Sequence, residues 1–343
     1  MATLNPQVST GTIGDAAPSA GAHPANHKYY DREFIQVAAP LLVYDMFGER
    51  AQVPNNGSNT MVVNKVAKLA TLEGSALSEG VTPNGQNFTT TRLEKSFNQY
   101  GGYAITTDRL QEETVNGITS EFNRILAEQA GETMNLVCRD DLLGSTNVRY
   151  SNAAANRNAF GAASTSDHLE GDLSYMFQSF KNAHVKPFRP MTTGSPNTGT
   201  APTRESYPVV IPVEAIGQLE GMDDGNGNTF TNTEKYAGQK STWMNEYGSY
   251  KQFAFILDTE ASVVVNANAT PQDVALGLVF GKGAYKTTTL AQGEIKRITK
   301  PLGSAGTEDP LDQRASMGWK AKKGCFVVQP TYMFRWEFSL GNN

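Results

Sequence analysis

The sequence predicts an α+β protein in which helices and strands occupy separate stretches of the chain. Three observations lead to this fold class. Residues 119–143 carry apolar side chains at helical spacing, residues 55–107 read as a long β excursion, and short strands dominate beyond residue 208. With 343 residues, the chain is long enough for about two domains and a sizeable buried core.

The N-terminal 26 residues are rich in Ala, Pro, Ser, Thr and Gly, a composition that buries too little apolar surface to fold alone. From Tyr29 onward, apolar side chains recur at helical spacing, including Phe34 and Leu41. Pro40 interrupts this stripe and predicts a kink or two short helices, which end at Gly48. We therefore expect an N-terminal arm that is held in place by another surface.

Residues 55–107 contain two strand-like segments joined by a polar, glycine-rich tip. Two strands with so little apolar surface make a poor independent domain. In the returning segment, Leu93, Phe97 and Tyr103 are separated by even numbers of residues, so they would lie on the same face of a strand. We therefore expect this excursion to gain its stability by lying on another surface.

The longest predicted helix spans residues 119–143, and its apolar line includes Phe122 and Leu126. A capping-box pattern at Asp167 and Glu170 opens a second helix. Near the end of the chain the residues alternate cleanly, with Tyr332, Phe334, Trp336 and Phe338 on one face and Met333, Arg335 and Glu337 on the other. This alternation predicts a strand with Phe334 and Trp336 in the core.

The charge balance argues against a high-affinity nucleic-acid binder, because 29 Lys and Arg face 34 Asp and Glu for a net charge of −5. An acidic chain is still compatible with lining a compartment that holds DNA. No signal-peptide pattern follows Met1, and no apolar run approaches the ~20 residues of a membrane span, so we expect no membrane association. Cys138 and Cys325 lie in apolar patterns without metal-ligand spacing, which predicts buried, reduced thiols.

Candidate chemical motifs are all incomplete. His23 and His27 lack the intervening Glu of a zinc protease, and Gly277–Gly283 is one residue short of a phosphate-binding loop. Asp224, Asn226 and Asn228 alternate as in a calcium loop, but the glycine and the closing Glu are missing. We therefore expect no catalytic, cofactor-binding or metal-binding residues, and a protein that is not an enzyme.

The order of these elements resembles the Johnson fold of tailed-bacteriophage major capsid proteins, which encapsulins and the herpesvirus capsid floor share. The resemblance spans roughly Tyr29 to Phe338, and nine short segments carry it. They are Tyr29–Asp31, Ala39–Tyr44, Glu79–Pro83, Gln99–Gly101, Thr107–Asp108, Pro212–Val213, Gly248–Ser249, Asp309–Arg314 and Gly318–Lys320. They look most like the branch that includes the capsid protein of the coliphage with a virion-packaged RNA polymerase.

The resemblance implies a division of the chain into four parts. These are an N-terminal arm (1–54), an extended β-loop (55–107), a peripheral domain with a spine helix (108–165 and 290–343) and a mixed axial domain (166–289). It implies a structural subunit that forms pentamers and hexamers of an icosahedral head around double-stranded DNA. The implied inter-subunit contacts are Phe34, Leu41, Leu42, Leu93, Phe97 and Tyr103.

The resemblance also implies partners and a location. The chain would bind itself, together with scaffolding, portal and cement or decoration proteins, with DNA only weakly and non-specifically nearby. It would assemble in the host bacterial cytoplasm and end in the virion. Some members of the wider fold crosslink a loop lysine to an asparagine; Lys65, Lys68 and Lys95 are present here, but no partner can be named.

Three alternatives remain open at this stage. An encapsulin-like nanocompartment shell has the same fold, and a cargo enzyme in the gene neighbourhood would favour it. A soluble hydrolase would elute as a small oligomer in size-exclusion chromatography. A tail-tube or decoration protein would usually be shorter and would lack a spine helix.

Overall fold

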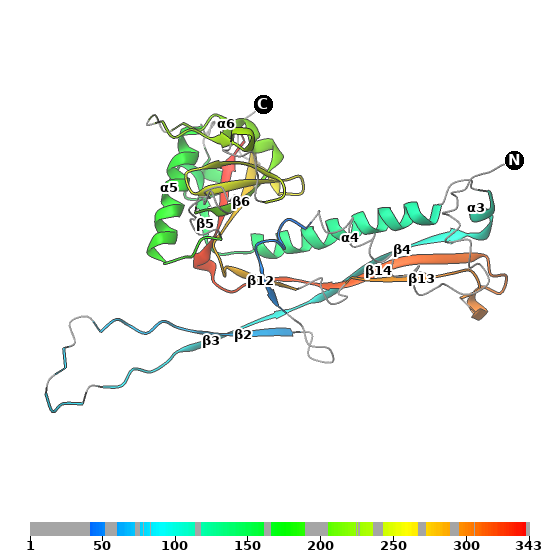
Figure 1. The fold of residues 1–343 in the computed structure, drawn as a ribbon, viewed down its shortest axis with the longest axis horizontal. Coiled ribbons are helices and arrows are strands. Elements are labelled where there is room, and N and C mark those ends of the chain that lie inside the picture. Colours follow the sequence, from blue (N-terminus) through cyan, green and yellow to red (C-terminus); the bar gives the residue numbers. More distant parts are fainter. Residues whose placement is uncertain are drawn as a thin grey trace, which may run out of the picture.

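The structure is a computed structural model. The chain forms an elongated body, a globular body and a projecting β-loop (Figure 1). It describes residues 42–51, 60–72, 76–77, 79–82, 84–113, 118–160, 166–188, 205–223, 225, 227–235, 243–266, 272–288, 295–304 and 306–340. The expected helix before Gly48 lies largely outside these residues. Residues 43–47, which are described, form turns and not a helix.

The elongated body consists of one long helix on a three-stranded antiparallel sheet. Helix α4 (Ile118–Leu143) agrees with the predicted helix to within one residue. The sheet has the order β13 (Ile295–Lys300), β14 (Arg314–Lys323) and β4 (Asn98–Thr107), and the short helix α3 (Asp108–Glu113) follows β4. The helix packs closely on the sheet because Gly102 has no Cβ; a Cβ there would come 2.6 Å from the Gln129 side chain. The Trp319 indole donates a hydrogen bond to the same Gln129 oxygen at 3.1 Å.

The globular body is built on a mixed eight-stranded sheet. Its order is β5-β16-β11-β6-β9-β8-β7, with β10 paired to β11. The strands are β5 (Val148–Tyr150), β6 (Tyr207–Pro212), β7 (Thr231–Asn232), β8 (Glu246–Tyr250), β9 (Phe253–Asp258), β10 (Val263–Asn266), β11 (Gln272–Phe280) and β16 (Met333–Ser339). Pairs β6/β9 and β5/β16 are parallel and the others are antiparallel.

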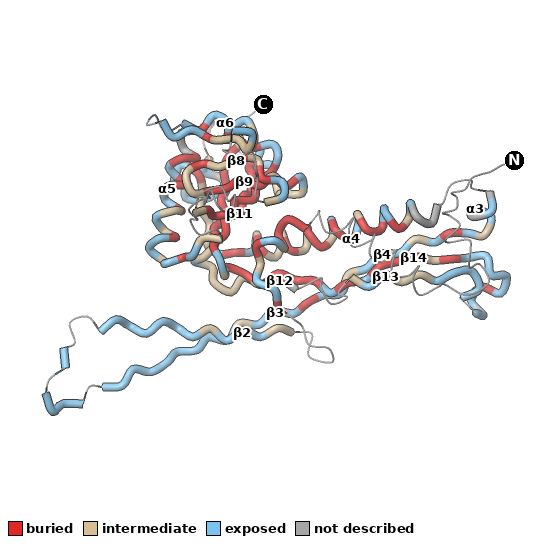
Figure 2. Tube along the Cα trace, in the orientation of Figure 1, coloured by how far each residue is buried: buried red, intermediate tan, exposed pale blue. Residues whose placement is uncertain are grey.

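Both faces of this sheet are covered (Figure 2). On one face, α5 (Ser166–Asn182) and α6 (Ile216–Glu220) bury a cluster that includes Leu173, Phe180 and Trp336. On the other face, the end of α4 and the segment around Tyr44 bury a second cluster that includes Leu142 and Phe280. A sheet buried on both faces needs long apolar strands, and β6 and β11 are such strands.

The last strand lies in the globular body and is buried on both faces. Residues 290–343 were assigned to the domain of the spine helix, but β16 lies in the eight-stranded sheet between β11 and β5. Its second face is also buried, because Glu337 is fully covered and makes a bidentate ion pair with Arg157 at 2.7 and 2.8 Å. Alternation reveals one buried face, but it cannot reveal a charged residue that is buried by a distant arginine.

The cysteines correct one expectation of the sequence. A small sheet, β1-β12-β15, joins the two bodies through β1 (Glu49–Ala51), β12 (Tyr285–Thr288) and β15 (Cys325–Val327). Cys325 at the start of β15 forms a disulfide with Cys138 on α4, with a Cα–Cα distance of 5.0 Å that lies within the usual range. The prediction of reduced thiols is therefore wrong. The two positions are 187 residues apart in sequence, so only the fold brings them together.

The part of the extended β-loop between residues 60 and 96 projects away from both bodies (Figure 1), whereas residues 98–107 of the predicted loop form β4 of the elongated body. Strands β2 (Thr60–Val66) and β3 (Thr90–Ser96) pair in antiparallel register from Thr60 opposite Ser96 to Val66 opposite Thr90. Beyond these strands, the described residues up to the tip are exposed. Figure 2 therefore shows a long arm whose described residues beyond the paired strands are exposed, as its composition predicts.

Candidate assembly surfaces

The β-loop carries large apolar side chains that no described residue of the chain covers. Leu77 is 76% exposed and Phe88 is 71% exposed, and Leu72 and Val81 are similarly open. Several large exposed apolar side chains on one projecting segment are typical of an interaction surface. The loop is therefore the strongest candidate for a contact with another molecule.

The predicted contact residues fall into three groups. Phe34 and Leu41 lie outside the described residues. Tyr103 is 74% exposed on β4, and Leu93 is partly buried opposite Val63 in the β-loop. Leu42 and Phe97 are buried within the chain itself.

The burial of Leu42 and Phe97 corrects their assignment as inter-subunit contacts. Leu42 belongs to the apolar cluster beneath α4. Phe97, the one residue between β3 and β4, packs on Gly324, where a Cβ would lie only 2.5 Å from the Phe97 ring. Both side chains are therefore already covered by their own subunit.

The residues predicted to form the core lie as follows. Leu126, Phe334 and Trp336 are buried, and Phe122 is partly buried at the edge of the α4 cluster. The Trp336 indole donates a hydrogen bond to Asp172 at 3.3 Å, which satisfies its one polar atom.

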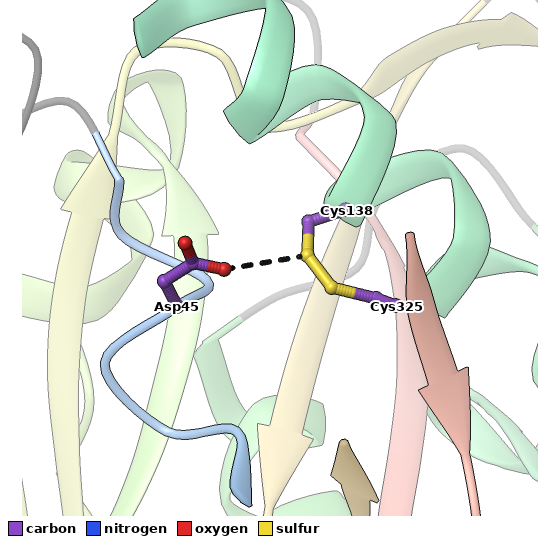
Figure 3. Close-up of side chains that lie close together, drawn as sticks. All are labelled: Asp45, Cys138 and Cys325. Atoms are coloured by element: carbon purple, nitrogen blue, oxygen red, sulfur yellow. Dashed lines mark hydrogen bonds between the residues drawn. A yellow bond between two sulfur atoms is a disulfide. The ribbon is translucent and has the colours of Figure 1, made fainter. Parts of the chain in front are cut away.

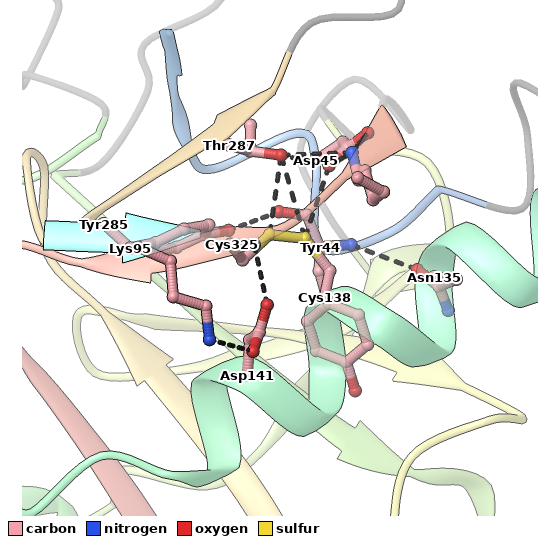
Figure 4. Close-up of a disulfide and its surroundings, with 10 residues drawn as sticks. Tyr44, Asp45, Lys95, Asn135, Cys138, Asp141, Tyr285, Thr287 and Cys325 are labelled. Atoms are coloured by element: carbon pink, nitrogen blue, oxygen red, sulfur yellow. Dashed lines mark hydrogen bonds and ion pairs between the residues drawn. A yellow bond between two sulfur atoms is a disulfide. The ribbon is translucent and has the colours of Figure 1, made fainter. Parts of the chain in front are cut away.

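A network of charges fixes the base of the β-loop (Figure 4). The Lys95 ammonium on β3 lies 2.5 Å from the Asp141 carboxylate on α4. The second Asp141 oxygen accepts the backbone N–H of Cys325 at 3.0 Å. One carboxylate thus ties the loop, the spine helix and β15 together beside the disulfide.

A second ion pair fixes the segment that leaves the N-terminal arm. The Lys323 side chain is 1% exposed, and its ammonium lies 2.5 Å from both oxygens of Asp45. The Thr287 hydroxyl donates to the same carboxylate at 2.7 Å, and the Tyr285 hydroxyl donates to the backbone oxygen of Tyr44. A buried pair of charges is tolerated only with such additional hydrogen bonds.

Sequence reasoning did not identify either ion pair. Lys323 follows an alternating run of lysines in β14 that looks like a solvated face, and Asp45 lies 278 residues away. No local pattern connects two such positions. One clue is present in the sequence of β14. Lys323 lies on the opposite face of the strand from Lys320 and Lys322, because side chains alternate between the two faces.

The same region holds the one group of three potential metal ligands among the described residues, namely Asp45, Cys138 and Cys325 (Figure 3). A cysteine binds a metal ion through its free thiolate. Here the two sulfurs are bonded to each other, and Asp45 is engaged by Lys323. The three residues are therefore held by a disulfide and an ion pair, which join α4, β15 and the segment around Asp45.

A pocket between α4 and the end of β9 collects carboxylates. Glu132, Glu246, Asp258 and Glu260 line it. Burial raises the pKa of Asp258, although the Glu260 backbone N–H and the Asn135 amide both donate to it. The described residues that line this pocket also include Tyr247 and Thr259, but no histidine, cysteine, lysine or arginine.

The arrangement of spine helix, three-stranded sheet, projecting β-loop and globular mixed sheet defines a class: the chain has the fold of tailed-phage major capsid proteins. The capsid of Ralstonia phage GP4 matches with a TM-score of 0.63 and 8% identity over 84% of this chain and 85% of that one. The mature capsid of bacteriophage PhiM1 matches with a TM-score of 0.55 and 8% identity over 86% of each chain.

Sequence comparison leads to the same class. The chain is 26% identical over 300 residues to the major capsid protein of Pseudomonas phage KPP21, which covers 81% of this chain and 74% of the relative. No family model matches the sequence. The resemblance to tailed-phage major capsid proteins is thereby confirmed. Within the described residues, no helix is long and apolar enough to cross a membrane.

Proposed function

We propose that this chain is the major capsid protein of a tailed bacteriophage, a structural subunit of the icosahedral head that encloses double-stranded DNA. One observation carries the proposal: a capsid fold, similar in sequence to a phage major capsid protein, projects a β-loop whose apolar side chains its own subunit leaves exposed. Such a surface is typical of a site that another molecule covers.

The subunits assemble through this loop and through the N-terminal arm, which lie on neighbouring copies in pentamers and hexamers. The loop joins the rest of the chain at a rigid base, since Lys95 pairs with Asp141 on the spine helix. A contact that joins a projection on one copy to a different surface on the next is heterologous, and it closes into rings when the rotation allows. Large apolar interfaces are typical of such obligate assemblies.

The role is structural and not catalytic. Assembly takes place in the host bacterial cytoplasm and involves scaffolding, portal and cement or decoration proteins, with the packaged DNA nearby. An encapsulin-like shell is the alternative with the same fold; the sequence similarity to a phage capsid protein favours the virus. Membership of the branch that includes the coliphage with a packaged RNA polymerase stays a prediction.

Co-expression with the neighbouring morphogenesis genes tests the proposal. We expect closed shells of megadalton mass in sedimentation and electron microscopy. A variant in which residues 67–89 are replaced by a short glycine-containing turn should remain folded, because the deleted residues contribute nothing to the described clusters, but it should form no shells. Monodisperse monomer from the unmodified chain would contradict the proposal.

A further inference from the structure

The junction beside the spine helix brings three potential metal ligands together from three separate segments of the chain. Asp45 lies in the turns before β1, Cys138 lies on α4, and Cys325 begins β15 (Figure 3). One carboxylate oxygen and the two sulfurs all lie within 4.8 Å of one another. Bonds of about 2.0–2.3 Å to one tetrahedral zinc ion set its ligand atoms roughly 3.3–3.8 Å apart. The Asp45 oxygen is already 3.6 Å from the Cys138 sulfur, so the main movement that such an ion requires is separation of the two sulfurs.

Surrounding residues hold these ligands in place from outside (Figure 4). The backbone N–H of Cys325 donates to Asp141 at 3.0 Å, and the Lys323 ammonium lies 2.5 Å from both oxygens of Asp45. The Thr287 hydroxyl donates to Asp45 at 2.7 Å and lies 3.5 and 3.7 Å from the two cysteine sulfurs. Outer partners of this kind orient the ligands of metal sites and set their affinity. The three ligand side chains are therefore oriented toward one point before any ion arrives.

The charges at this junction favour one divalent, thiol-seeking ion. Both cysteines are buried, and Lys323 is 1% exposed, so a net charge here would be costly. Two thiolates and the Asp45 carboxylate carry three negative charges, and a divalent ion with the Lys323 ammonium carries three positive ones. The buried site is therefore neutral when it is filled. Thiolate ligands select zinc, whereas magnesium and calcium prefer oxygen ligands alone.

The ion can bind only when the disulfide is open. A small thiol reductant opens it: the S–S bond breaks, each cysteine sulfur becomes a thiol, and the reductant is oxidised to its own disulfide. Binding of the ion then displaces one proton from each thiol to solvent, so that both sulfurs bind as thiolates. A bacterial cytoplasm, the compartment proposed above for assembly, keeps thiols reduced. A newly made chain in that compartment therefore passes through the state that can bind the ion.

We propose that Asp45, Cys138 and Cys325 form a zinc site in the reduced subunit, and that the ion and the disulfide are alternative links across the same junction. The disulfide joins α4 to β15, and the ion joins both of them to the segment around Asp45 as well. A water molecule beside the Thr287 hydroxyl completes the four ligands. Zinc sites that tie separate segments together add directly to folding stability. The inference goes beyond the function proposed above and holds for the single subunit.

Titration of the soluble full-length subunit with Co²⁺ tests the site, because thiolate-to-cobalt bonds give a charge-transfer band in the near ultraviolet. We expect the reduced subunit to develop this band and to saturate at one Co²⁺ per chain. Added Zn²⁺ should displace the Co²⁺, abolish the band and raise the Tm of the reduced subunit, while the Tm of the oxidised subunit should not change. A reduced wild-type subunit without the band would overturn the proposal. So would equal stabilisation of the two redox forms by Zn²⁺, which would place the ion elsewhere.

Variants of the reduced subunit identify the ligands. Asp45→Asn should weaken Zn²⁺ binding by about tenfold or more, and Cys138→Ser and Cys325→Ser should each abolish the two-thiolate band. The matched control Asp140→Asn removes a carboxylate of α4 that is 65% exposed and should leave the affinity unchanged. Thr287→Val keeps all three ligands and should weaken binding about tenfold, which provides a second test if Asp45→Asn does not fold. Unchanged Zn²⁺ affinity in Asp45→Asn, or a full band in either serine variant, would overturn the assignment.

Discussion

Single residues at the centre of the globular body carry much of its stability. Phe334 is buried on β16, where its ring lies 5.3 Å from that of Phe180 on α5. Trp336 follows on the same face and is in ring contact with Phe338 at 4.5 Å. Aromatic pairs at these distances stabilise a core beyond the area that they bury. The core therefore depends on the contact between the last strand and the first helix of this body.

Truncation of Phe334 should be costly for this reason. We expect Phe334→Ala to lower the free energy of unfolding by about 3–5 kcal/mol, because it removes a buried aromatic ring and leaves a cavity. Denaturant unfolding of the soluble subunit, followed by tryptophan fluorescence, measures this change. Tyr103→Ala is the matched control, since that side chain is exposed and should change subunit stability by less than about 0.5 kcal/mol. Equal stability of Phe334→Ala and wild type would place Phe334 outside the core.

At the scale of elements, one junction holds the helix, the loop, the arm and β15 in fixed positions. Asp141 links α4 to the β-loop and to β15, Asp45 links the arm to β14, and the disulfide links α4 to β15 (Figure 4). These contacts are buried or partly buried, so solvent screens them less than surface pairs. The β-loop can therefore be long and open while its base remains precisely oriented.

The disulfide should contribute measurably to this junction. In the chain-entropy account, closing a loop of 187 residues stabilises the folded state by about 5 kcal/mol. We expect reductant to lower the Tm of the wild-type subunit, and Cys138→Ser and Cys325→Ser each to lower it similarly. Differential scanning calorimetry measures the three values. Reductant should have no further effect on either variant, and a wild-type Tm that is indifferent to reductant would show that the bond does not constrain the chain in solution.

The sequence predicts the elements better than it predicts their contacts. Helix α4 is found within one residue because its apolar positions repeat at helical spacing over about seven turns. The segment Gly277–Gly283, considered above only as an incomplete phosphate-binding loop, overlaps the end of strand β11. This is a central strand in which Gly277 lies against Ile211, since a Cβ there would come 3.1 Å from that side chain. Close approach of two strands explains this glycine, but the neighbouring strand is invisible to local pattern.

The candidate surfaces follow the same division. The exposure of the loop tip and Tyr103 could be predicted, because composition alone indicates too little apolar surface for a separate core. The burial of Leu42 and Phe97 could not, because it depends on α4 and Gly324, which are remote in sequence. The position of Lys296 directly opposite Lys320 could not be predicted either, because it depends on the register that aligns β13 with β14.

For the whole molecule, the loop should change state when subunits assemble. Ordering a residue costs roughly 1–2 kcal/mol, and the loop tip has no core from which to recover that cost in the free subunit. Burial of Leu77, Phe88 and their neighbours on another copy gains about 25 cal/mol per Å². We therefore expect fast hydrogen exchange across residues 67–89 in unassembled subunits and strong protection in shells.

Helix α4 provides the internal reference for that measurement, since its buried face should keep it protected in both states. Mass spectrometry of peptides from the two preparations gives both values in one experiment. Equal protection of the loop before and after assembly would mean that it packs on its own subunit.

The bond between Cys138 and Cys325 also determines how the subunit transmits tension. A pull between the two ends of the chain travels along α4 to Cys138, crosses the sulfurs to Cys325 and continues into β16. The intervening residues form a closed covalent circle that includes β6, β9 and β11, the central strands of the globular body. That circle corresponds to about 600 Å of extended chain that cannot be drawn out while the bond is intact. A shell under pressure from within can thus load its subunits without unravelling these strands.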